Sequence, residues 1–184
     1  MLFPSIVGLQ KSSKGGNCMS KGNSGLFKGT NGSNNGRIIP GKDGIVTGGN
    51  SSTLGKNMLK EMGVSKGKWT GYQAQHIIPA HMANHPVLQK IGMNLDDASN
   101  GVFLRIPGKN ISTMSRHRGF HSVYSEFVKQ ELNKINLSND SVTIQKQVHS
   151  LQNKLRKLQN SGLPLYSSEG ATVELWRKHY NKLK

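Results

Sequence analysis

Three apolar stripes at helical spacing occupy the last third of the sequence and limit the choice of architecture. They predict helices from about residue 121 to 136, from about 138–140 to 162, and from about 171 to the end. Apolar residues that recur every three or four positions line one face of a helix, so these helices can bury those faces together as a core. The stripes consist of Val123, Phe127, Val128, Leu132 and Ile135, then Ile144, Val148, Leu151, Leu155 and Leu158, then Val173, Trp176, Tyr180 and Leu183.

Two short segments ahead of these helices favour β-strands. Residues 73–78 contain two isoleucines and stop at Pro79, and residues 102–104 read Val-Phe-Leu. β-Branched and aromatic residues are enriched in strands, and proline interrupts the backbone hydrogen bonding of a strand. Short strands followed by a run of helices predict an α+β fold.

The connection between the two strands has local signals of its own. Residues 86–91 begin with proline and are followed by Gly92, which predicts a short helix capped at both ends. Residues 96–101 read Asp-Asp-Ala-Ser-Asn-Gly, which is turn chemistry, and Asn100-Gly101 is the pair that best tolerates positive φ. A turn is therefore expected directly before the second strand.

Residues 10–68 are rich in glycine, serine, asparagine and lysine. Such a sequence has too little apolar surface to offset the entropy cost of ordering its backbone. We interpret residues 1–68 as a flexible basic leader or linker and residues 69–184 as the folded domain. Within the leader, residues 38–39 and 45–46 favour a brief strand pair, and residues 53–62 favour two helical turns.

The net charge of +16 favours a polyanionic partner, because basic side chains displace counterions from phosphates. On charge alone, a ribosome-like or merely basic protein is an equal alternative. The single cysteine, Cys18, excludes a disulfide scaffold. No apolar run reaches the roughly 18 to 20 residues of a membrane span, and residues 1–9 lack the basic start of a secretory signal, so we expect neither.

Five of the seven histidines lie between residues 71 and 124. Metal-assisted phosphodiester hydrolysis needs a base that takes a proton from water and a cation that offsets charge on the phosphate. His76 suits the base, since imidazole titrates near neutral pH. His117 and His121, spaced i, i+4, suit a shared cation if both lie at the start of the following helix.

Each of these assignments has an alternative. His76 stands next to two isoleucines and also fits a partly buried structural histidine. His117 and His121 also fit a basic phosphate-binding face together with Arg116 and Arg118.

A rival pair of histidines repeats the same spacing. His81 and His85 are also four residues apart. Pro86 disfavours helical backbone at His85, which makes this pair the less suitable of the two.

Three separated blocks follow one another in a specific order. They read Gln-His-Ile-Ile-Pro at residues 75–79, Asn-Gly-Val-Phe-Leu at 100–104 and His-x-x-x-His-x-x-Tyr at 117–124. In this order they resemble the HNH/endonuclease VII superfamily, and most closely the AHH nuclease domains found at the ends of bacterial polymorphic toxins. The resemblance covers about residues 71–132. It implies a ββα-metal core with additional C-terminal helices and one divalent ion.

The resemblance also implies roles for individual residues. His76 becomes the general base, and Asn100 the residue that orients the catalytic loop. Tyr124 takes a supporting position after the helix histidine. Arg116 and Arg118 would hold the phosphate, which suits their fork of donors.

The implied metal ligands are His121, His117 as a second ligand, and the residue before His76. At that last position the family has histidine, whereas this chain has Gln75. An amide oxygen binds a cation more weakly than imidazole, so Mg²⁺, Zn²⁺, Mn²⁺ and Ni²⁺ are all open. Gln75 ligates through its oxygen, or the ion relies on His117, His121 and waters, or the site is impaired; relatives with few protein ligands favour an active site.

The resulting prediction is a metal-dependent endonuclease that cleaves DNA with little sequence specificity and acts as an antibacterial toxin. The resemblance implies an acidic immunity protein as partner, synthesis in a bacterial cytoplasm and delivery into a target cell by a specialised system. Three alternatives stay open: RNA as the substrate, a catalytically silent basic nucleic-acid-binding protein, and a structural part of a secretion or phage tail apparatus.

Overall fold

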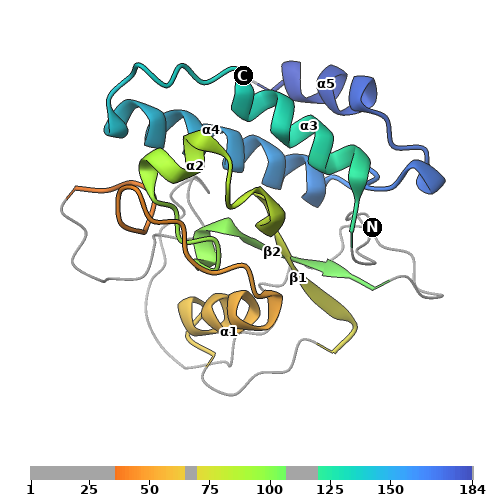
Figure 1. Cartoon of the computed structure of the whole chain (residues 1–184). Coiled ribbons are helices and arrows are strands. Elements are labelled where there is room, and N and C mark those ends of the chain that lie inside the picture. The colour runs from red at the N-terminus through yellow and green to blue at the C-terminus, as the bar shows by residue number, and fades with distance from the viewer. Residues whose placement is uncertain (1–35, 65–69, 107–119, 184) are drawn as a thin grey trace, which may run out of the picture.

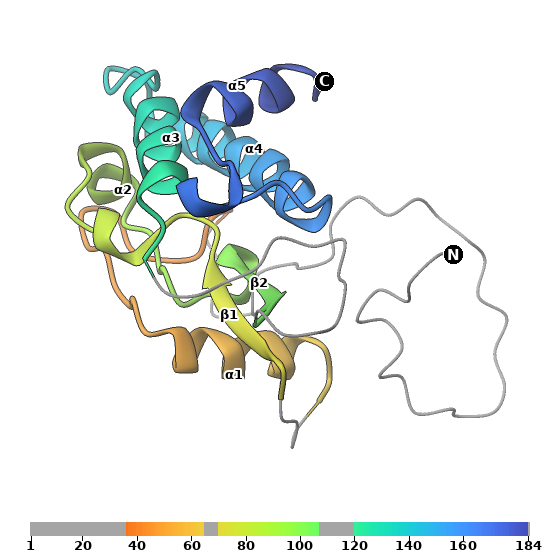
Figure 2. The same cartoon turned by 90° about the vertical axis from the view of Figure 1, so that its right-hand side faces the viewer.

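A computed structural model of the chain describes residues 36–64, 70–106 and 120–183. These residues form a mixed fold of helices and a small sheet, which confirms the predicted α+β class. The sheet lies between α1 on one side and the other helices on the opposite side (Figures 1 and 2). The elements are α1 (Ser51–Glu61), β1 (Tyr72–His76), η2 (Ala80–Met82), α2 (Pro86–Ile91), η3 (Ala98–Asn100), β2 (Gly101–Arg105), α3 (Ser122–Asn133), α4 (Ser141–Asn160), η4 (Ser167–Glu169) and α5 (Val173–Asn181).

The sheet consists of β1 and β2, which pair antiparallel with His76 opposite Gly101. Successive side chains of a strand point to opposite faces, so the two faces of this sheet belong to different cores. Ala74 and Phe103 pack in the cluster beneath α1, whereas Val102 belongs to the larger core under the remaining helices. By the same alternation, Gln75 faces the larger helical layer and His76 faces α1.

The helix α1 packs closely on the sheet. It begins after Asn50, whose side chain accepts the backbone N–H groups of the first turn, and it buries Leu54 and Met58 completely or almost so. Gly101 makes this approach feasible, because a Cβ there would lie 2.4 Å from the sulfur of Met58. The two helical turns predicted for residues 53–62 are confirmed. A helix with its apolar side buried on the sheet is part of the core, so the expected boundary at residue 69 falls inside a packed unit.

The segment before α1 is also attached to the domain. Gly41 and Thr47 form isolated bridges with Met93 and Asn94, and Lys42 bridges Ile45 across the turn. The predicted strand pair between residues 38–39 and 45–46 is therefore wrong, since this segment pairs with the chain after α2. The leader interpretation does not hold for residues 36–64, because contacts with distant residues supply the order that their own composition lacks.

The three C-terminal helices form one packed layer, as their stripes predict. Trp176 of α5 is completely buried, and its indole N–H donates to the backbone carbonyl of Pro164 at 2.8 Å. Its ring meets those of Tyr124 and Phe127 on α3, with centroids 4.8 and 5.8 Å away. This aromatic contact ties α5 to the helix that carries the last predicted site block. In the described part of the chain, no helix has the length and apolar character needed to cross a bilayer.

Candidate active site

Asn100 joins two of the three sequence blocks. Its amide donates to the carbonyls of Ile78 and Leu95 at 3.1 and 3.0 Å, and its side-chain oxygen accepts the N–H of Ile78 at 2.8 Å. Its own carbonyl accepts the N–H of Ile77 at 2.8 Å. Asn100 is completely buried, so these bonds form away from water. They fix the chain as it leaves β1.

Tyr124 joins the third block to the same segment. Its hydroxyl donates to the carbonyl of Ile77 at 2.6 Å and accepts from the amide of Gln159 at 2.6 Å. Burial raises the pKa of Tyr124 far above its ordinary value, so the phenol stays protonated and keeps donating. A second glutamine of α4, Gln152, donates to the side-chain oxygen of Asn100 at 3.1 Å. The three blocks therefore converge on residues 77–78.

His76 forms a pair with Asp96. Its Nε2 lies 2.9 Å from the carboxylate oxygen Oδ1 of Asp96, and both side chains are more than nine-tenths buried. A carboxylate only accepts, so Nε2 must carry the hydrogen, and the neutral ring then has its lone pair on Nδ1. Nδ1 has no hydrogen-bond partner among the residues that the structure describes. This tautomer is the one that a base needs.

Asp96 is itself held by the loop before α1. Its Oδ1 also accepts the backbone N–H groups of Gly49 and Asn50 at 2.7 and 2.9 Å. Gly48 permits this close approach, because it has a φ of 82° and a Cβ there would lie 2.8 Å from the carboxyl carbon of Asp96. Three donors on one oxygen stabilise the charged carboxylate and set its position. The partner of His76 is thus immobilised before any substrate arrives.

Gln75 meets His121 on the other face of β1. The amide Nε2 of Gln75 lies 2.7 Å from Nε2 of His121, and both residues are buried. An amide nitrogen donates, so Nε2 of His121 carries a lone pair and the ring hydrogen is on Nδ1. Ser125 supports this tautomer, since its Oγ lies 3.4 Å from Nδ1. His76 and His121 consequently bond to different partners, and no described hydrogen bond joins them.

The helical spacing expected for His117 and His121 does not apply. His121 is the residue before α3, with an extended backbone of φ −127° and ψ 91°, and its side chain makes no capping bond. It therefore precedes the helix, and its ring contacts Gln75. His117, Arg116 and Arg118 lie outside the described residues.

The side chains of Gln75 and His121 fit part of a metal site. Among the described residues, no group of three or more histidine, cysteine, aspartate or glutamate side chains is close enough to hold an ion. His121 nevertheless presents the Nε2 lone pair that metal ligation requires, with its other nitrogen oriented by Ser125. A half-turn of the Gln75 amide directs its oxygen toward that lone pair, an arrangement of two acceptors that favours a cation between them. These two residues would supply two ligands of such a site.

His81 and His85, the rival pair, do not form a site for one shared cation. His85 is the N-cap of α2, with Nδ1 accepting the N–H of Val87 at 3.3 Å and Nε2 2.9 Å from Asn133. His81 instead packs edge-on against the ring of Phe120, with centroids 5.3 Å apart. The extended backbone at His85, with ψ 130°, is the conformation that the following proline favours.

The expected positive φ at Asn100-Gly101 is wrong. Residues 98–100 form a short 3₁₀ helix, η3, and Gly101 begins β2 with φ −111° and ψ 151°. Within the described residues, no residue other than glycine has a positive φ. Glycine is needed at 101 for space beneath α1, and the turn chemistry appears instead as Asp97, whose side chain caps η3 through the N–H of Ser99.

Sequence reasoning missed Asp96 as a site residue. One signal was present, because Asp96 and Asp97 are the only carboxylates between residues 71 and 124. It also missed Gln152, Gln159 and Ser125, which act through Asn100, Tyr124 and His121. Glutamine and serine on a helix are common surface residues, so no sequence signal distinguishes these three.

The order β1, β2, α3, with this polar centre at the end of β1, is consistent with the α+β fold of HNH-like nucleases. Residues 56–161 match the AHH family, a nuclease family of the HNH/ENDO VII superfamily with conserved AHH. The chain belongs to this family, as its motifs predict. Searches among curated proteins and among solved structures each found no match.

Proposed function

We propose that this nuclease is a metal-dependent endonuclease that hydrolyses DNA phosphodiester bonds. The observation that carries the proposal is the arrangement at the end of β1. Two adjacent residues there carry a carboxylate-held imidazole, His76 with Asp96, and a pair of candidate metal ligands, Gln75 with His121, on the two faces of the strand. A base and a cation site within one dipeptide are the two components that phosphodiester hydrolysis requires.

His76 acts as the base in this proposal. With Nε2–H donated to Asp96, Nδ1 takes a proton from the attacking water, and the carboxylate stabilises the imidazolium that forms. Asn100 and Tyr124 keep the chain after β1 in place and so fix the position of the His76 ring. This division makes His76 the catalytic residue and the other three positioning residues.

Gln75 and His121 hold the ion, with His117 as the third ligand expected from the sequence. When bound, a divalent ion supplies positive charge that offsets the charge on the phosphate and on the leaving oxygen. Arg116 and Arg118 are proposed to hold the phosphate through their guanidinium groups. An amide ligand in place of imidazole predicts a weakly bound ion that is lost on dialysis against a chelator.

Nicking of supercoiled plasmid tests the proposal. The chain is incubated with plasmid DNA, and in parallel with a structured RNA of similar mass, in Mg²⁺ or Mn²⁺. We expect nicked and then linear plasmid, loss of cutting with chelator and recovery when the ion is restored. Cutting that survives chelation and extensive dialysis would contradict the metal requirement, and faster cutting of RNA would move the assignment to the RNase alternative.

A catalytically silent nucleic-acid-binding protein is the second candidate. Gln75 favours it, because its amide nitrogen occupies the lone pair of His121 that an ion would use. This candidate predicts salt-sensitive binding of plasmid with no cutting in any of the four ions. The plasmid assay therefore separates the two candidates when bound DNA is measured in the same samples.

We further propose that the chain acts as an antibacterial toxin delivered by a specialised system and neutralised by an acidic immunity protein. The resemblance to toxin-borne AHH domains and the net charge of +16, which favours an acidic partner, support this. Expression of the chain in bacteria should arrest growth and degrade the chromosome, and His76→Ala should relieve both. Normal growth at a level of expression detectable in extracts would contradict the toxin role.

A further inference from the structure

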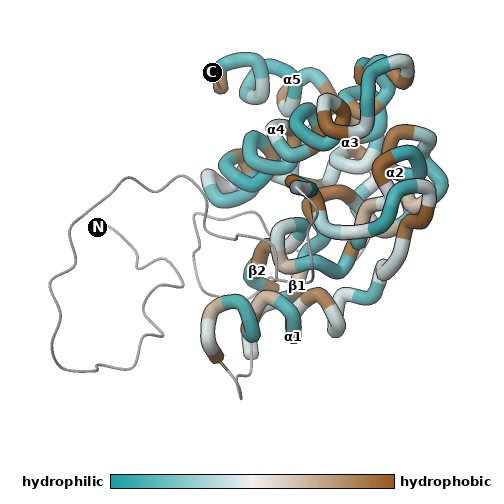
Figure 3. Tube along the Cα trace, turned by 90° about the vertical axis from the view of Figure 1, so that its left-hand side faces the viewer, coloured by the Kyte–Doolittle hydropathy of each residue, from teal (hydrophilic) through white to brown (hydrophobic). Residues whose placement is uncertain are grey.

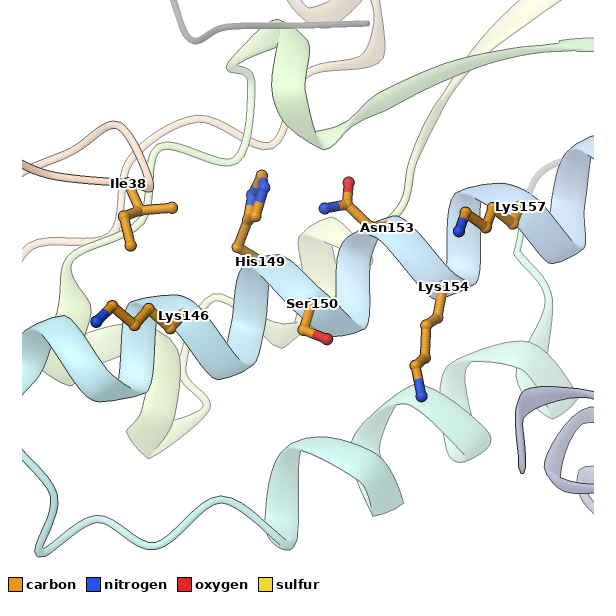
Figure 4. Close-up of a pocket in the computed structure, with 7 residues that line it drawn as sticks. All are labelled: Ile38, Lys146, His149, Ser150, Asn153, Lys154 and Lys157. Atoms are coloured by element: carbon orange, nitrogen blue, oxygen red, sulfur yellow. The ribbon is translucent and has the colours of Figure 1, made fainter. Parts of the chain in front are cut away.

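The outward side of α4 borders a groove that the proposed mechanism does not use. The groove encloses about 460 Å³ and is lined by Ile38, Lys146, His149, Ser150, Asn153, Lys154 and Lys157. Figure 4 shows His149 and Asn153 projecting from the same side of α4, with Ile38 facing them from the segment before α1. That segment forms a wall because the N–H groups of Ile38 and Ile39 donate to the side-chain oxygen of Gln145 at 3.0 and 3.2 Å.

The groove carries positive charge that the described structure does not neutralise. The 20 residues of α4 contain three lysines and an arginine and no aspartate or glutamate. Among the described residues, the ion pairs involve Asp43, Asp96 and Glu131, and none of them reaches a lysine of α4. The visible turns of α4 are mostly hydrophilic in Figure 3. Uncompensated charge in a concave site attracts anions more strongly than the same charge on a convex surface.

The spacing of these side chains matches a linear polyanion. Lys146, Ser150, Asn153 and Lys157 follow one another at intervals of three or four, so they form one stripe along α4. From Lys146 to Lys157 the helix rises roughly 16 Å. A nucleic-acid strand places one phosphate in about 3.4 Å along its axis, so the stripe spans about five phosphates. Serine and asparagine between lysines are additional phosphate donors.

The groove is connected to the candidate active site through the same helix. One guanidinium N–H group of Arg156 donates to the carbonyl of Ser99, beside Asn100. Another donates to the side-chain oxygen of Asn153 at 3.2 Å. Gln152 contacts Asn100 itself. Burial lowers the pKa of Arg156 to about 10, so its charge is retained at neutral pH. A strand lying in the groove would therefore lie next to the turn that positions His76.

We propose that this groove along α4 binds the sugar–phosphate backbone of the nucleic-acid substrate and extends the substrate contact beyond the catalytic turn. The inference rests on the proposed function for the identity of the substrate. The contact is to phosphates and carries no base specificity, because the groove presents cationic and small polar groups in a row along one helix. It also gives the C-terminal helical layer a role in substrate binding.

The test compares two pairs of exposed lysines in the full chain. The groove variant carries Lys146→Gln with Lys157→Gln, and the matched control carries Lys129→Gln with Lys182→Gln, on α3 and after α5. Both changes remove two charges from exposed positions. Lys154 is left intact because its ammonium lies 4.9 Å from the ring centre of Tyr180 and contributes to packing. Circular dichroism and thermal unfolding establish that both variants are folded.

Binding to a short DNA duplex is measured across a range of salt concentrations, with His76→Ala in every protein so that the duplex stays intact. We expect the groove variant to bind at least tenfold more weakly at 0.1 M salt. The slope of log K against log salt concentration should become shallower by up to about 1.8, at about 0.9 for each lost phosphate contact. The control should keep the slope of the parent. Equal slopes and affinities for groove variant and control would overturn the proposal.

The same proteins with His76 restored separate this inference from the proposed function. If the wild type cuts and the groove variant binds DNA as well as its parent, the groove proposal is rejected and the endonuclease proposal stands. If the wild type does not cut and the groove variant has a reduced salt slope, the endonuclease proposal is rejected. The groove then stands as a nucleic-acid-binding site.

Discussion

The segment that follows β1 and the Gln75–His121 pair are neighbours in sequence but differ in how they are held. Residues 77–78 receive bonds from Asn100 and Tyr124, which are in turn bonded to Gln152 and Gln159 of α4. In the Gln75–His121 pair, the two side chains are hydrogen-bonded to each other, Ser125 makes a long contact with His121, and the His121 ring packs edge-on against Tyr124 and Tyr166. The bonds of the first region join backbone groups to buried side chains of η3 and α3, whereas the hydrogen bond of the second uses the imidazole lone pair that a metal ion would need. We infer that this family member preserves the positioning of its base and has altered its metal ligands.

Asn100→Ala should have the largest effect, because it breaks the rigid region. Removing the side chain leaves several buried partners in the segment after β1 without hydrogen bonds, each at about 1–3 kcal/mol. We expect the free energy of unfolding in urea to fall by about 3–5 kcal/mol. Asn160→Ala, at an exposed position at the end of α4, should change it by less than about 0.5 kcal/mol. A loss below about 1 kcal/mol for Asn100→Ala would show that the segment is held by other contacts.

Asp96→Asn should reduce catalysis with a smaller effect on stability. The amide oxygen can still accept the N–H groups of Gly49 and Asn50, but the negative charge that stabilises imidazolium is lost. The rate of plasmid cutting should fall on the order of 10²-fold, within the range of general acid–base catalysis. DNA affinity should be unchanged when measured in parallel by gel shift. A rate equal to that of the wild type would remove Asp96 from the proposed mechanism.

His121→Ala tests the second region directly. Since a ligand is removed, the Mn²⁺ concentration that gives half-maximal cutting should rise at least about tenfold. Loss of a residue that only orients a metal ligand already lowers metal affinity by about this factor. The side chain of Asn100 hydrogen-bonds to backbone groups, whereas the ring of His121 hydrogen-bonds to the side chain of Gln75, so thermal unfolding should shift less than for Asn100→Ala. Ser125→Ala serves as the comparison and should shift the half-maximal concentration in the same direction by a smaller factor. An unchanged Mn²⁺ dependence would place the ion elsewhere.

Gln75→His should sharpen the contrast by restoring the family residue. Imidazole binds borderline and soft divalent ions more tightly than an amide oxygen does. Half-maximal cutting should then occur at a several-fold lower Zn²⁺ or Ni²⁺ concentration, with little change for Mg²⁺. If Gln75→His leaves every metal dependence unchanged, Gln75 is a structural partner of His121 and not a ligand.

The pH dependence of stability should show the smallest effect. Burial lowers the pKa values of His81 and His149 below 6.5, and the charge of Arg156 adds to the shift at His149. The unfolded chain therefore binds more protons just below pH 6.5 than the folded chain, so stability falls as the pH decreases through that range. Each half-exposed group should contribute under about 1 kcal/mol. In urea unfolding at pH 7.5 and 5.5, His149→Gln should reduce the difference, and an unchanged difference would contradict this assignment.

Local patterns predicted most of the fold. The stripes of α3, α4 and α5 and the cap at Gly92 are periodic or adjacent signals, and the structure has the helices within a few residues of the expected bounds. The segment at 36–64 was not predictable in this way, because its order comes from pairing with Met93 and Asn94 and from burial of Leu54 and Met58 on the sheet. Contacts between distant residues leave no periodic trace in the sequence.

The site was predictable where a motif named the residue and not where a contact defined it. Motifs named Asn100 and Tyr124, and both side chains hydrogen-bond to the segment after β1. Asp96 became recognisable as a site residue only from the structure, in which antiparallel pairing brings the end of β1 beside the start of β2. His121 has an extended backbone before α3 and contacts Gln75 of β1, and the spacing of His117 and His121 carries no signal for either feature.

Plasmid cutting by His76→Ala is the most direct test of the base at the end of β1. Wild type and variant are compared at saturating divalent ion, with the rate normalised to the fraction of plasmid bound and with circular dichroism as the control for folding. The arrangement with Asp96 predicts a rate at least about 10²-fold lower at equal binding. A variant that binds and cuts at the wild-type rate would contradict it and make His76 a buried structural histidine.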